Sequence, residues 1–198
     1  MSSDKITFYN AIICPYAQRA AIALKEVGAE YEKVEIDLSN KPDCIAESLV
    51  IIDLLPKDPL KRAYIRYFIE IFSSKVNSEF FKFIFNIKEE NARIEYEKNI
   101  GASFERLNEL LVQQSPSGPY FLGNEYSLAD IAVAPFVARI KGFNKLFLDG
   151  YEIEALKKFP RLAEFFDAIT DRPSFKETYC GDQAYIDVLN KRFNIVKK

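Results

Sequence analysis

The residues in this sequence best suited to chemistry are four consecutive ones near its start, Cys14-Pro15-Tyr16-Ala17. A short strand-like run precedes them and a helical pattern follows, so the sequence predicts a thiol at the N-terminus of a helix. The unpaired N–H groups and the dipole at such an end favour negative charge, and thiols there ionise more readily. The thiolate is the nucleophilic form of cysteine, so Cys14 is the candidate catalytic residue.

The composition limits how this thiol can be activated. The 198 residues include no histidine, which excludes Ser-His-Asp and Cys-His catalysis and removes the commonest metal ligand. The three cysteines, Cys14, Cys44 and Cys180, are too widely spaced for a disulfide framework or a zinc site. We therefore expect free thiols, no metal, activation by helix position or neighbouring cations, and a reducing, cytoplasmic location.

Charge and hydropathy disfavour nucleic acid and membrane partners. The 27 basic and 29 acidic residues nearly balance, so the chain carries no basic footprint for nucleic acid. No run is apolar over the ~18 residues that a membrane-spanning helix needs. The polar start, Met-Ser-Ser-Asp-Lys, lacks the hydrophobic segment of a signal peptide. We expect neither nucleic acid nor a membrane as a partner.

The first part of the chain predicts a strand, a helix and a second strand. Residues 5–10 and 31–38 alternate apolar and polar side chains, whereas residues 15–27 place apolar side chains at helical spacing. Gly28 stands where a left-handed helix cap is expected. Such a unit normally has parallel strands and a right-handed crossover. Another helical stripe covers residues 45–55.

The remainder predicts helices only. Residues 56–58 form a linker, in which Asp58 suits a helix N-cap and the following Pro59 suits the first helical position. The predicted fold is therefore an α/β domain over residues 1–55 and an all-helical domain over residues 59–198. Helical patterns cover these four ranges: 59–86, 89–114, 160–170 and 182–193.

A further helix follows Ser127-Leu128-Ala129-Asp130. Serine at the N-cap with an acid three residues later is a capping signature, so we assign Ser127 and Asp130 to folding and not to catalysis. Pro135 lies inside this helix and is expected to bend it.

Together these motifs resemble the cytosolic glutathione transferases, most closely the omega class and related fungal cysteine-type enzymes. The segment from Cys14 to Arg19 resembles the omega-type active-site turn, and Glu47-Ser48 resembles the pair that receives the γ-glutamyl group of glutathione. Segments of the helical part resemble the family as well: Tyr120-Phe121-Leu122-Gly123, Ser127 to Ile131, Pro160-Arg161-Leu162 and Arg172-Pro173-Ser174-Phe175-Lys176.

The resemblance implies a thioredoxin-like N-terminal domain, abbreviated here, before an all-helical glutathione transferase domain. It implies a glutathione-dependent thiol transferase or dehydroascorbate reductase that works through a Cys14 mixed disulfide. Glutathione would be the cosubstrate, beside a small hydrophobic or oxidised substrate, and the protein would be a homodimer. The implied glutathione-binding residues are Cys14, Pro15, Tyr16, Glu47 and Ser48.

The motif is of the monothiol type. Ala17 occupies the place where a dithiol oxidoreductase carries its second cysteine. A disulfide formed by Cys14 must therefore be resolved by an external thiol, or by Cys44 if the fold brings it close.

One segment of the family pattern is missing. The family has a helix and two strands, the first preceded by a cis Val-Pro peptide, between the second strand and the Glu-Ser helix. Here only six residues separate Leu38 from Ile45, and Pro42 lies in an unrelated Lys-Pro-Asp turn. Either the protein lacks this segment, or the molecule contains residues that the sequence omits. A true loss would favour the alternative function, a non-catalytic binding or regulatory protein.

Several candidates also have a purely structural interpretation. Cys14 could be a buried free cysteine, and Glu47 and Ser48 could simply cap a helix. Arg19 could stabilise a thiolate or face solvent. Cys180 is expected to be structural or exposed. Four phenylalanines could line a substrate pocket but are better explained as core: Phe80, Phe81, Phe83 and Phe85.

The question of the missing segment has a direct test. The printed sequence corresponds to 22.8 kDa. If the protein lacks the segment, the intact mass of the purified protein will equal that value. A mass larger by several kilodaltons would show instead that residues are omitted from the sequence.

Overall fold

The computed structural model describes residues 6–38 and 54–193 and begins with the predicted α/β unit. Its strands, β1 (Ile6–Asn10) and β2 (Tyr31–Glu35), are parallel and are connected through α1 (Pro15–Glu26). Gly28 has the expected left-handed conformation, with φ of 64°. The second strand was expected to reach residue 38 but ends at Glu35. Its last partner is Asn10, after which β1 gives way to the turn that leads to Cys14.

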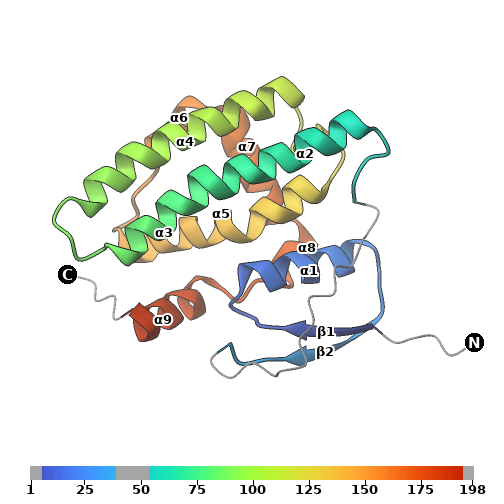
Figure 1. Cartoon of the computed structure of the whole chain (residues 1–198), viewed down its shortest axis with the longest axis horizontal. Coiled ribbons are helices and arrows are strands. Elements are labelled where there is room, and N and C mark those ends of the chain that lie inside the picture. The colour runs from blue at the N-terminus through green and yellow to red at the C-terminus, as the bar shows by residue number, and fades with distance from the viewer. Residues whose placement is uncertain (1–5, 39–53, 194–198) are drawn as a thin grey trace, which may run out of the picture.

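After residue 58 the described chain consists of helices and connecting loops, with two isolated bridges within residues 120–125 and no strand, as predicted. In Figure 1, α1 lies between the two strands and the layer formed by the long helices. No described helix is long and apolar enough to cross a membrane. The division into domains at residues 56–58 stays a prediction. The helical elements are α2 (Pro59–Ile71), η1 (Phe72–Asn77), α3 (Ser78–Phe85), α4 (Ala92–Gln114), α5 (Leu128–Phe147), α6 (Glu154–Lys158), α7 (Pro160–Asp171), α8 (Pro173–Lys176) and α9 (Asp182–Phe193).

The helix predicted over residues 59–86 contains a π-helical stretch, η1, which the sequence pattern did not reveal. The apolar side chains buried along it recur every four residues, at Phe68, Phe72, Val76, Phe80 and Ile84. An α-helix has 3.6 residues per turn, so a strict period of four drifts around its axis. The wider π-helical turn in the middle compensates for this drift, so the buried apolar residues stay on one side of the helix. That side packs against α4 and α5.

Two N-caps formed as the sequence predicted. The Asp58 side chain accepts hydrogen bonds from the backbone of Leu60 and Lys61 at the start of α2. At the start of α5, Oδ2 of Asp130 accepts bonds from the backbone N and the hydroxyl of Ser127, both at 2.7 Å. Its Oδ1 accepts a bond from the Phe121 backbone N at 2.8 Å, and burial raises the pKa of Asp130 to about 6. This carboxyl group therefore fixes both α5 and the loop before it.

The substitution Asp130→Ala should lower the free energy of unfolding by about 2–4 kcal/mol, because it removes a cap and leaves two buried N–H groups without acceptors. Chemical denaturation will measure the change. Asp167→Ala is the matched control, since that side chain is 75% exposed and bonds only Lys141 at the surface. The control should change stability by less than about 0.5 kcal/mol. Equal losses in both variants would contradict this role.

An ion pair joins α1 to the end of the helical part. The guanidinium of Arg172 donates to both carboxylate oxygens of Glu26, at 2.7 and 2.6 Å, and also to the hydroxyl of Tyr120 at 2.9 Å. The Glu26 side chain is only 13% exposed. The hydrogen bonds from Arg172 hold the pKa of Glu26 below its usual 4.5, against the effect of burial. A bidentate pair of this kind orients α1 as well as holding it.

The pair should make stability depend on pH in a defined window. Because folding lowers the pKa of Glu26, its contribution is complete above pH 4.5 and is lost as the pH falls further. Glu26→Gln should thus cost about 2 kcal/mol near pH 7 and progressively less below pH 4.5, measured by denaturation across pH. Glu177→Gln, which removes an exposed partner of Lys25, is the control and should cost little. A deficit for Glu26→Gln that does not change with pH would refute this account.

Candidate functional site

Cys14 is the N-cap of α1, as the sequence predicted. Its backbone is extended, with φ of −79° and ψ of 118°, and Pro15 takes the first helical position. The thiol makes no capping hydrogen bond and the residue is partly exposed. A half-buried thiol at a helix N-terminus, with no hydrogen bond to the helix, is free to react with a substrate that reaches it.

The side chains of Tyr16 and Arg19, in the first turns of α1 after Cys14, pack against α5. Tyr16 is 60% exposed and its ring meets that of Phe136, on α5, edge to face at 5.2 Å. The guanidinium of Arg19 lies over both rings, 5.0 Å from the Tyr16 centroid and 4.7 Å from that of Phe136. Its Nε donates to the Ala132 carbonyl at 2.8 Å. Burial lowers the pKa of Arg19 to about 10, opposed by Tyr16 and Cys14. Because its guanidinium packs on two rings and bonds a carbonyl of α5, Arg19 does not simply face solvent.

A second guanidinium, that of Arg139 on α5, bonds the carbonyl of Ile13, next to Cys14, and is 1% exposed. It packs over the rings of Tyr179 and Tyr185 at 5.5 and 5.4 Å. Burial lowers the pKa of Arg139, and this effect is opposed mainly by Cys180, then by the two tyrosines and Cys14. Arg139 thus lies within electrostatic range of two thiols that are more than 160 residues apart in sequence.

Sequence reasoning missed Arg139. The available signal was a single charge within an apolar run, Ala132-Val-Ala-Pro-Phe-Val-Ala-Arg-Ile140. Within the described residues, neither Arg139 nor Arg19 has a carboxylate at ion-pair distance. Among the described residues, the buried Arg139 and the half-buried Arg19 thus place positive charge near Cys14 with no carboxylate to balance it.

The remaining cysteine and glutathione-binding candidates divide into two groups. Glu47, Ser48 and Cys44 lie outside the described residues, as does most of the helix expected over residues 45–55. Cys180 is a free, partly buried thiol between α8 and α9. Burial raises the pKa of Cys180, and Arg139 opposes that effect. Among the residues described, no group of three cysteine or acidic side chains could hold a metal ion.

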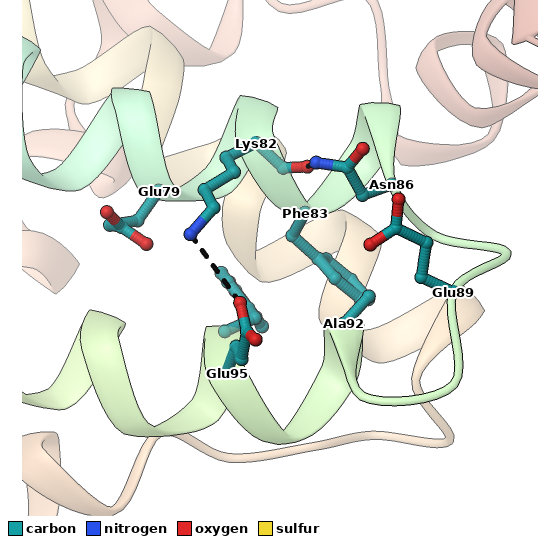
Figure 2. Close-up of a pocket in the computed structure, with 8 residues that line it drawn as sticks. Glu79, Lys82, Phe83, Asn86, Glu89, Ala92 and Glu95 are labelled. Atoms are coloured by element: carbon teal, nitrogen blue, oxygen red, sulfur yellow. Dashed lines mark hydrogen bonds and ion pairs between the residues drawn. The ribbon is translucent and has the colours of Figure 1, made fainter.

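The four phenylalanines do not line a pocket at Cys14. Phe80 and Phe83 are buried in the core and Phe81 packs against it, as expected, but Phe85 is 64% exposed and contributes little to either role. A small pocket does lie between α3 and α4, where Figure 2 shows Lys82 pairing with Glu95 across the opening. This pocket contains no residue of the Cys14 turn, the segment from Ala11 to Gln18 around the thiol. Its lining residues are Glu79, Lys82, Phe83, Asn86, Glu89, Ala92, Glu95 and Tyr96.

Comparison with known proteins identifies two family regions in the chain. The model for the glutathione S-transferase C-terminal domain matches residues 64–178, more than half of the chain. The model for the glutathione S-transferase N-terminal domain matches residues 4–49, which include the Cys14 turn.

Individual relatives agree with this assignment. A probable glutathione S-transferase from Glycine max is 28% identical, with 89% of this chain and 88% of that protein covered. The maleylacetoacetate isomerase of Rattus norvegicus is 30% identical, with 66% and 74% covered. The crystal structure of glutathione transferase Omega 1C from Trametes versicolor superposes with a TM-score of 0.74 at 29% identity, covering 96% and 97% of the chains.

The match to the Glycine max protein also indicates how many residues this sequence lacks relative to that protein. That alignment spans 206 positions, whereas 89% of this 198-residue chain is about 176 residues. About 30 positions therefore hold a residue of the relative and none of this chain. A helix and two strands of average length, with their connections, need a segment of about this size.

The family matches and the arrangement of the strands and helices indicate the same fold. The parallel strands with α1 are a short thioredoxin-like domain, and the helices from α2 onward are the helical domain of the family. The chain belongs to the glutathione S-transferase family.

Proposed function

We propose that this chain is a glutathione-dependent thiol transferase of the omega type, with Cys14 as the residue that carries glutathione. The observation that supports this most is the position of the thiol. It lies at the N-terminus of α1 and makes no capping bond, and the buried guanidinium of Arg139 bonds the carbonyl of the preceding residue, Ile13. A tyrosine or serine at this point would activate glutathione itself, whereas a cysteine is a nucleophile in its own right.

The proposed reaction is two successive thiol–disulfide exchanges. The Cys14 thiolate attacks the glutathione sulfur of a mixed disulfide, forms a Cys14–glutathione disulfide and releases the other thiol, which takes up a proton. The thiolate of a second glutathione then attacks the sulfur of the bound glutathione. Oxidised glutathione leaves and Cys14 returns to its thiolate, so two electrons pass from glutathione to the substrate.

Glutathione binding is assigned to five residues. Cys14 is the N-cap of α1, and Pro15 and Tyr16 are the first two residues of that helix. Glu47 and Ser48 are proposed to hold the γ-glutamyl end. From the resemblance to the glutathione transferases we also propose that the protein is a homodimer in the cytoplasm and acts on a small hydrophobic or oxidised substrate.

A second candidate is a non-catalytic binding or regulatory protein. The observation that favours it is the shortening of the chain by about 30 positions relative to the Glycine max protein. If the lost positions include those that pair with the glutathione backbone, Cys14 would remain while glutathione affinity fell.

Incubation with oxidised glutathione, followed by peptide mass spectrometry, distinguishes the two functions. A thiol transferase should acquire one glutathione on Cys14, which added glutathione removes, and Cys14→Ser should lose at least about 99% of the turnover with a glutathionylated peptide. Cys180→Ser is the matched control and should retain turnover. An unmodified Cys14 that still reacts with iodoacetamide would favour the binding protein. Turnover retained in Cys14→Ser would contradict the proposed role of Cys14.

A further inference from the structure

The peptide unit that precedes Cys14 is held at both of its polar ends. Nη2 of Arg139 donates to the Ile13 carbonyl at 3.0 Å, and the N–H of Cys14 donates to the Ala11 carbonyl at 2.7 Å. Because this unit is planar, two such bonds set the orientation of the whole group. The Arg139 bond is the only one of the two that comes from outside the N-terminal domain.

The first turn of α1 is tied to the same guanidinium. Nη1 of Arg139 donates to Oε1 of Gln18 at 2.7 Å, and to the Pro135 carbonyl of its own helix at 2.8 Å. Gln18 is 2% exposed, and its backbone N–H donates to the Cys14 carbonyl at 3.0 Å. Hydrogen bonds thus reach the backbone on both sides of Cys14, one directly from Arg139 and one through Gln18.

We infer that Arg139 is the positioning residue of Cys14: it fixes the direction of the Cα–Cβ bond that carries the reacting sulfur, and leaves only the side-chain torsion to vary. The inference rests on the proposed function for its catalytic consequence. A guanidinium can bond the Ile13 carbonyl and the Gln18 amide oxygen with donors that are fixed in one plane, whereas the three donors of an ammonium rotate about its bond. Its place on the buried helix α5 makes the reference frame rigid, as a precise site requires.

The energetic cost of the arrangement agrees with this role. A guanidinium that is 1% exposed and has no carboxylate partner among the described residues is expensive to bury. An apolar side chain of similar length could fill the same space in the core. The bonds of Arg139 to the Cys14 turn are what such a side chain could not supply.

The test compares the full-length chain with Arg139→Met and Arg139→Lys, and uses Arg161→Met as the control. Arg161 is also buried and also donates to backbone carbonyls, those of Ser115 and Tyr120, but it makes no bond to the Cys14 turn. Two quantities are measured: the steady-state kinetics of thiol transfer from a glutathionylated peptide, and the NMR hydrogen exchange of the Cys14 and Gln18 amides.

Arg139→Met should lower kcat about tenfold while KM stays within about twofold, because the sulfur is misplaced while binding surfaces remain. Arg139→Lys should recover part of the loss, Arg161→Met should keep kcat, and the two amides should exchange faster only in the Arg139 variants. Unchanged kcat in Arg139→Met, or an equal loss in Arg161→Met, would overturn the inference.

Two further outcomes are decided by the same data. If the wild-type chain shows no turnover, the proposed function fails, and the positioning role is then judged from amide hydrogen exchange alone. Faster exchange of the Cys14 and Gln18 amides in Arg139→Met supports that role, and unchanged exchange overturns it. If Arg139→Met does not fold, Arg139→Lys takes its place, with lower kcat and faster exchange supporting the inference and wild-type values overturning it.

Discussion

The burial of helix α5 is the constraint on which the rest of this structure depends. Fifteen of its 20 residues are buried, and it packs against α1, α2, α7 and α9. A helix without a solvent face must be surrounded before it is stable, so its neighbours are fixed by it. The approach of α9 is close: a Cβ at Gly142 would lie 2.6 Å from Oδ1 of Asp182. The capping box at Ser127 and Asp130 determines where this central helix begins.

The position of Cys14 depends more on contacts with helix α5 than on the sheet. Within the described residues the sheet has two strands, and a pair of strands is marginally stable without a helix against it. Helix α1 supplies that cover and is itself held on the helical domain by Arg19, Arg139 and the Glu26–Arg172 pair. The Cys14 turn therefore takes its geometry from the helical domain. These bonds fix the position of the thiol although the described part of the sheet has only two strands.

The parts of the structure that could be predicted from sequence are those set by local interactions. The strand–helix–strand unit and the N-caps at Cys14, Asp58 and Ser127 follow from periodicity and from residues a few positions apart. The π-helical stretch was missed because an apolar period of four fits an α-helix almost as well.

The bonds that complete the site join residues more than a hundred positions apart, so no local pattern could reveal them. Arg139 shows this most clearly. A charge within an apolar helix indicates that the side chain is buried and bonded, but the sequence does not indicate which residues it bonds. The role of Glu47 and Ser48 stays a prediction, since both lie outside the described residues.

If Cys14 carries glutathione in this protein, as we propose, a mixed disulfide should form on its sulfur. A crystal structure of the protein after incubation with oxidised glutathione tests it most directly. We expect continuous density from the Cys14 sulfur to a bound glutathione, with Arg139 still bonded to the Ile13 carbonyl. A reduced Cys14 without glutathione, or glutathione attached only to Cys180, would contradict it.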